Sequence, residues 1–141
     1  MPKKYILGAA AVLFVIIFFA GIKLVNQNQL QIYTEEQSGK IIEARQVVEN
    51  WITNYSPTYV FDGMNLSLNK ITALDLNGCK DCFQFEYRFE SRQAGYGDRT
   101  GKILAQVITP HIIIVTIESG RITRAVTDGI YDELEGRMIG E

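Results

Sequence analysis

The stretch CFQFEYRFESR, residues Cys82 to Arg92, decides the fold class of this chain. Polar and charged side chains alternate without exception with the aromatic side chains of Phe83, Phe85, Tyr87 and Phe89. Strict alternation at a period of two predicts a β-strand with one face on a hydrophobic core and the other in solvent. The solvent face alternates in charge from Glu86 to Arg92, which favours ion pairs with neighbouring strands and discourages aggregation.

Three further strands are predicted around this one. The four predicted strands cover residues 66–76, 82–92, 103–118 and 121–127. In the first, Ile71 is out of phase with the leucines, so we expect a bulge near Lys70. The third is interrupted by Pro110, which predicts one long strand that bends there, because proline cannot donate to a strand ladder. Residues 131–139 are predicted to form one or two helical turns.

A single amphipathic helix is predicted before the sheet. Thr34 and Gln37 have the spacing of a capping box, and Pro57 forces the helix to end. The apolar residues between them recur at steps of three and four and form one stripe: Ile41, Ala44, Val48, Trp51, Ile52 and Tyr55. The sequence therefore predicts an α+β domain in which one helix packs on a four-stranded antiparallel meander.

This element order resembles that of small exported domains of the cystatin-like and PepSY-like kind, over residues 36–127. The resemblance is in element order, and it implies a small extracytoplasmic domain. The predicted first turn reads NGCKDC, residues 77–82, and lacks the glutamine-valine-glycine loop of the cystatin inhibitors. A role as an inhibitor of cysteine proteases is therefore not implied.

A single transmembrane helix is predicted at the N-terminus. Residues 6–22 are 17 consecutive uncharged, mostly large apolar residues, the lower limit for a helix that crosses a hydrocarbon core of about 30 Å. Lys3 and Lys4 precede this run, and the excess of positive charge favours a cytoplasmic N-terminus. We expect contact with the lipid bilayer through residues 6–25 and an extracytoplasmic C-terminal domain.

The chain is thus divided into three predicted segments. They are a transmembrane signal anchor at residues 1–25, a polar spacer at 26–34 and an exported α+β domain at 35–141. A cleaved secretory signal is the alternative. The bulky Phe18 argues against it, since cleavage after Ala20 needs a small residue at the −3 position.

The charge balance argues against nucleic acid as a partner. The chain has 14 basic and 16 acidic residues. Lys3, Lys4 and Lys23 belong to the anchor, so the remainder has 11 basic against 16 acidic residues and a net charge of −5. No cluster of lysine and arginine is present that would neutralise phosphates and release counterions.

Cys79 and Cys82 are the only cysteines, and we expect them to form a disulfide in an exported domain. Free or weakly redox-active thiols are an alternative. A thioredoxin-like pair would stand at the N-terminus of a helix, and none is predicted there. A zinc site would need two more ligands besides the cysteines, and the single His111 with a carboxylate makes such a site a weak alternative. No metal or cofactor is expected.

Residues 91–102, SRQAGYGDRTGK, form the candidate binding loop. The loop concentrates glycines and hydrogen-bonding side chains at one hairpin end, and its length exceeds that of a usual hairpin connection. The candidate contact residues are Arg92, Tyr96, Asp98, Arg99 and Thr100, together with His111. The alternative is an ordered loop in which Asp98 and Arg99 pair locally. His111 is either a general base or a hydrogen-bonded structural residue.

These patterns predict a membrane-anchored extracytoplasmic binding or inhibitory module that recognises a protein or peptide through its glycine-rich loop. One alternative is a thiol–disulfide redox protein or another small enzyme that uses the cysteine turn or His111. Another is a structural subunit of a membrane assembly. The position of His111 distinguishes them, because its convergence with residues 96–100 in a concave pocket would favour an enzyme.

Overall fold

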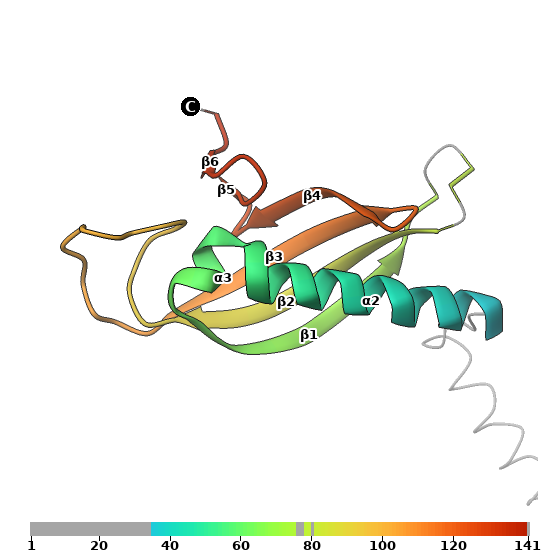
Figure 1. Cartoon of the computed structure of the whole chain (residues 1–141), viewed down its shortest axis with the longest axis horizontal. Helices are drawn as coiled ribbons and strands as arrows, with labels where there is room; N and C mark the ends of the chain where they lie inside the picture. Colours follow the sequence, from blue (N-terminus) through green and yellow to red (C-terminus); the bar gives the residue numbers. More distant parts are fainter. Residues whose placement is uncertain (1–34, 76–77, 80, 141) are drawn as a thin grey trace, which may run out of the picture. The chain divides into compact units, whose positions relative to one another are not determined.

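A computed structural model describes residues 35–75, 78–79 and 81–140, and it shows an α+β fold (Figure 1). The elements are α2 (Glu35–Tyr55), α3 (Pro57–Asp62), β1 (Gly63–Ala73), β2 (Cys82–Ser91), β3 (Thr109–Glu118), β4 (Arg121–Thr127), β5 (Tyr131–Asp132) and β6 (Arg137–Met138). The six strands form one antiparallel sheet in chain order. Helix α2 crosses one face of this sheet (Figure 1).

The prediction of a four-stranded meander is wrong, because residues 131–139 form β5 and β6 and not helical turns. The Asp132 side chain stabilises a turn between these two strands. The Asp132 carboxylate accepts hydrogen bonds from the backbone N–H groups of Leu134 and Glu135, at 2.9 and 3.0 Å. Gly136 then takes a positive φ of 65°. This turn reverses the chain and adds two short strands to the sheet.

The predicted anchor at residues 1–25 and the spacer at 26–34 lie outside the described residues. Within the part of the chain that the structure describes, no helix is long and apolar enough to cross a membrane. The anchor and its orientation therefore stay predictions.

Strand β2 forms the centre of the core, as its alternation predicts. Its four aromatic side chains are at most 3% exposed. They alternate along the strand and so share one face, and the Tyr87 hydroxyl donates to the Glu49 carboxylate of α2 at 3.0 Å, which places α2 over that face. From α2 the buried side chains are Ile41, Ala44, Val48 and Ile52. Burial of an aliphatic or aromatic side chain of this size stabilises the fold by about 1.5–3 kcal/mol. The buried stripe is narrower than predicted, since Tyr55 is 65% exposed.

Pro57 ends the first helix as predicted, but it also begins a second one. Proline is suited to the first helical position because its fixed φ is already helical and its missing N–H is not needed there. Helix α3 follows directly and ends at Asp62. The short α3 brings Thr58 and Asp62 to the end of the sheet where β2 ends. There both residues accept hydrogen bonds from the loop that follows β2.

The strand boundaries differ in how well the sequence predicted them. The register of β1 on β2 shifts between Leu68 and Lys70, so the irregularity near Lys70 is confirmed. Strand β3, however, begins at Thr109 and not at Ile103. Its partner β2 ends at Ser91, opposite Thr109, so residues 103–108 have no strand to pair with there. The predicted bend at Pro110 is also wrong, because that residue is the second of β3.

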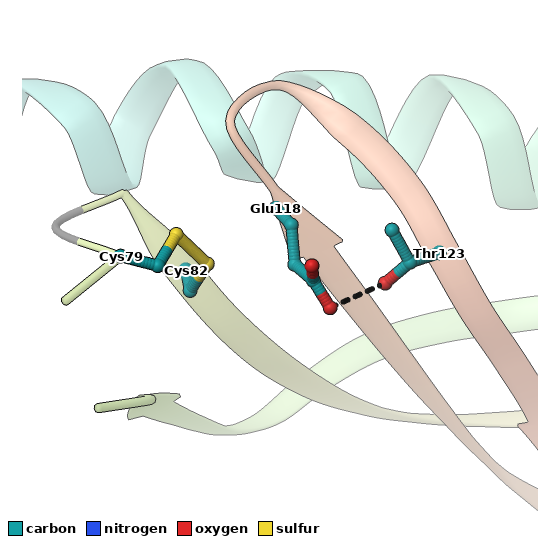
Figure 2. Close-up of a disulfide and its surroundings, with 4 residues drawn as sticks. All are labelled: Cys79, Cys82, Glu118 and Thr123. Carbon is teal, nitrogen blue, oxygen red and sulfur yellow. Dashed lines mark hydrogen bonds between the residues drawn. A yellow bond between two sulfur atoms is a disulfide. The ribbon is translucent and has the colours of Figure 1, made fainter. Parts of the chain in front are cut away.

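Cys79 and Cys82 form the predicted disulfide in the turn between β1 and β2 (Figure 2). The Cys82 side of the bridge is buried, with 1% of the residue exposed. The turn is tied to the β3–β4 hairpin, because the Ser119 N–H donates to the carbonyl of Asp81 at 3.1 Å. The bridge lies at the start of β2 and thus at the opposite end of that strand from the candidate loop.

Candidate functional site

The connection from β2 to β3, residues 92–108, extends beyond the end of the sheet (Figure 1, left). It consists of two parts that differ in their contacts. Residues 92–101, the loop base, are hydrogen-bonded to α3 and to the β4–β5 turn, and they contact β5 through a ring stack. Residues 102–108, the apolar arm, have exposed side chains except for the half-buried Leu104.

Arg99 binds the loop base to α3. Its side chain is 2% exposed, and its guanidinium lies over the ring of Phe61, 4.6 Å from the ring centre. The guanidinium donates to the carbonyls of Gln93 (3.1 Å), Gly95 (2.6 Å) and Thr58 (3.3 Å) and to the Asp62 carboxylate (2.6 Å). The planar fork of arginine suits such multiple contacts. Arg99 therefore holds the loop in place and is not available at the surface.

His111 lies between Ser91 and Asp128, in the order of a Ser-His-Asp triad. The Ser91 Oγ is 3.0 Å from His111 Nε2, and His111 Nδ1 is 2.7 Å from Asp128 Oδ2. Sequence reasoning missed both partners of His111. Asp128 follows β4 and lies near His111 only because β4 pairs with β3. The only signal for Asp128 in the sequence was its place in the Asp128-Gly129 turn dipeptide after that strand.

The burial of Ser91 argues against a hydrolase. Ser91 has no exposed surface, and its hydroxyl donates to the carbonyl of Gln93 at 2.7 Å. A nucleophilic serine has to direct its hydrogen to the histidine and to reach the substrate. Ser91 meets neither condition. We therefore interpret the hydrogen-bonded array of Ser91, His111 and Asp128 as structural: it holds the start of the loop base against β3 and the β4–β5 turn.

Tyr96 connects the loop base to this array. Its hydroxyl donates to Asp128 Oδ2 at 3.0 Å, and its ring meets the edge of the His111 ring with 5.4 Å between centres. On the other side it stacks on Tyr131 at 5.5 Å. Tyr96 therefore meets His111, but the two residues border different hollows among the described residues. The convergence in one concave pocket that would favour an enzyme is not seen there.

The remaining candidate residues point to solvent: Arg92, Asp98 and Thr100 are exposed. Asp98 bonds locally and does not pair with Arg99. Its carboxylate accepts hydrogen bonds from the Thr100 hydroxyl (2.6 Å) and the Thr100 N–H (2.9 Å), and these bonds lower the pKa of Asp98.

Two shallow hollows flank the array. One, of about 420 Å³, is bordered by Arg88, Glu90, His111 and Asp128, among others. The other, of about 530 Å³, is bordered by Tyr96, Asp98, Lys102 and Tyr131, among others. Ser91 borders neither. Among the described residues, no three His, Cys, Asp or Glu side chains gather in a way that could hold a metal ion.

The apolar arm presents an unusual group of exposed side chains. Ile103 is 103% exposed, Val107 52% and Ile108 53%. The backbone of the arm makes few hydrogen bonds. The Ala105 carbonyl accepts from the N–H groups of Ala94 (3.3 Å) and Val107 (3.1 Å). At its two ends, the Lys102 N–H donates to the Arg99 carbonyl (3.0 Å) and the Val107 carbonyl accepts from the Thr109 hydroxyl (3.0 Å). The sequence placed these residues in a strand, so their exposure was not foreseen. A large exposed apolar patch on a loop marks a candidate interaction site.

We predict that Tyr96 makes the domain less stable in strong alkali. Burial, with the hydrogen bond to the Asp128 carboxylate, raises the pKa of Tyr96 to about 12. An unfolded tyrosine loses its proton near pH 10, so between about pH 10 and 12 the folded state holds the extra proton and stability falls as pH rises. Urea unfolding at several pH values should show that the free energy of unfolding falls less steeply with pH in Tyr96→Phe than in the wild type. An unchanged slope would contradict the assignment.

No protein-family model, curated protein or solved structure matches this chain. The resemblance to cystatin-like and PepSY-like domains stays an expectation from element order. Function has to be argued from the site itself.

Proposed function

We propose that this domain is a protein-binding module whose contact surface is the apolar arm, residues 102–108. The observation that carries the proposal is the exposure of Ile103, Val107 and Ile108 on a loop whose base is bonded firmly to the domain. The predicted N-terminal anchor would present this surface outside the cytoplasm, within reach of a short tether.

The energetics of the arm support binding. Burial of each large aliphatic side chain against a partner is worth about 1.5–3 kcal/mol at most, so three such side chains form a plausible contact centre. Binding would also order little of the loop base, because Arg99, Ser91 and Tyr96 already hold it. A preorganised loop loses less conformational entropy when it binds.

The arm and the first residue of α2 lie at opposite ends of the described domain. The described domain begins at Glu35, and α2 carries the chain from there over 21 residues, or about 30 Å, toward the end of the sheet where the loop lies (Figure 1). Within the described domain, the arm therefore lies at the opposite end of α2 from Glu35.

The test uses the full chain in its native membrane, with a photo-crosslinker at Gln106. Ile103→Asp together with Ile108→Asp should reduce the crosslinked products at least tenfold, because charges replace the contact centre. The matched control is Ile42→Asp, which changes an isoleucine on α2 that is 58% exposed, close to the 53% of Ile108, and should leave the products unchanged. Equal crosslinking by the arm variant and the control would refute the proposal.

No specific observation favours the alternatives. A redox role requires an accessible, low-pKa thiol at a helix N-terminus, whereas Cys82 is buried at the start of a strand. A structural subunit would also need a contact surface, and the arm would serve it equally well. A fixed stoichiometry of the crosslinked product would favour that role.

A further inference from the structure

We infer that the partner of the apolar arm is an extended strand of another protein, which pairs with residues 103–108 as an addition to the sheet. This inference depends on the proposed function and specifies the kind of partner.

The backbone of the arm has unused hydrogen-bonding groups. Among the residues that the structure describes, five of its N–H groups donate to no protein atom: those of Ile103, Leu104, Ala105, Gln106 and Ile108. A row of unpaired donors and acceptors on an extended segment is a template for another strand. In strand addition these groups supply the affinity, and alternate side chains supply the specificity.

The arm is directly continuous with β3, which begins at Thr109. On one side of it, β2 ends at Ser91, because the Ser91 hydroxyl and the Arg99 guanidinium both bind the Gln93 carbonyl and draw the loop base toward α3. On the other side, β4 ends opposite Ile113. Neither strand reaches the arm. On the β2 side, however, the Ala94 N–H of the loop base donates to the Ala105 carbonyl at 3.3 Å, so the empty strand position within the described chain lies on the other edge of the arm.

The residue types of the arm suit a strand. Ile103, Val107 and Ile108 are β-branched and favour extended backbone, which is why the sequence alone predicted a strand from residue 103. What the arm lacks is a partner to complete its ladder. A strand supplied in trans would provide it.

The net charge of the domain favours a different protein over a second copy of this chain. Six extended residues span about 20 Å, and pairing over that length buries less than the roughly 800 Å² per partner of a stable interface. Two copies would also bring together domains that each carry a net charge of −5. A partner held near the same membrane gains effective concentration, so a short contact suffices.

The experiment uses the full chain in phosphatidylcholine nanodiscs and a displayed library of random octapeptides as the probe. Wild type should enrich peptides that carry apolar residues at alternate positions. The test variants are Ala105→Pro and Gln106→Pro, which remove N–H groups from opposite edges of the arm. At least one of them should weaken the selected peptides tenfold or more. Both should melt within a few degrees of wild type, since the lost N–H groups are unpaired in the free domain.

Each other result overturns the inference. Peptides that bind both proline variants as well as wild type, but fail to bind Ile103→Asp, would disprove strand pairing and leave the proposed function intact. Peptides indifferent to Ile103→Asp, or no enrichment at all, would remove support from both. Self-association of the wild-type chain that Ala105→Pro abolishes would assign the arm to a second copy.

Discussion

Replacing Arg99 with methionine is expected to lower the free energy of unfolding by about 3–5 kcal/mol, the usual cost of removing one member of a buried ion pair. The Asp62 carboxylate, whose side chain is 9% exposed, would lose its cationic partner at 2.6 Å. The carbonyls of Gln93, Gly95 and Thr58 would lose a donor as well. Methionine restores volume but donates no hydrogen bonds. Urea unfolding followed by Trp51 fluorescence measures the effect.

The matched control is Arg92→Met, which removes an exposed arginine from the same loop and should change stability by no more than about 0.5 kcal/mol. Adding Asp62→Asn to Arg99→Met should recover part of the loss, because the uncompensated charge is then removed. A loss below about 1 kcal/mol for Arg99→Met would show that the buried pair does not hold the loop.

The second large effect is expected at Gly97, where alanine should cost about 3 kcal/mol. Gly97 has a φ of +68°, which a residue with a side chain adopts only at a cost. A Cβ there would overlap the Tyr131 hydroxyl and lie 2.9 Å from the Cζ atom of that ring. Tyr131 would have to leave its stack on Tyr96, so the overpacking adds about 1–3 kcal/mol to the backbone strain.

Gly101→Ala separates the two contributions. Gly101 has a φ of +77°, but a Cβ added there would meet no atom within 4 Å, so only the backbone term of about 1 kcal/mol is expected. Tyr131→Phe in the Gly97→Ala background should relieve part of the clash. If Gly97→Ala costs no more than Gly101→Ala, the contact with Tyr131 has no energetic role.

Both residues bear on the proposed function through the loop base. Arg99 and Gly97 together bind the base to Thr58, since the Gly97 N–H donates to the Thr58 hydroxyl at 2.9 Å. If the base is loosened, the arm has to be ordered when it binds. Either substitution should therefore weaken crosslinking at Gln106, although neither side chain touches the partner.

The candidate residues show where reasoning from sequence stops. Glycines and polar side chains predicted a long loop over residues 91–102, whereas the connection in the structure covers residues 92–108. The polarity of the loop also gave no sign that Arg99 is buried. A charged side chain is buried only when partners from elsewhere neutralise and hydrogen-bond it. The partner Asp62 lies 37 residues away, and nothing local announces the pair.

The sequence by itself determined the α+β class, the central strand, the buried stripe of the first helix and the disulfide, because each depends on spacing within one short segment. Only the tertiary structure decided that residues 131–139 join the sheet, that His111 meets Ser91 and Asp128, and that the arm stays unpaired. A strand forms only where a neighbouring strand is present. Here the presence of that neighbour depends on where β2 ends, and contacts across the whole domain determine that end.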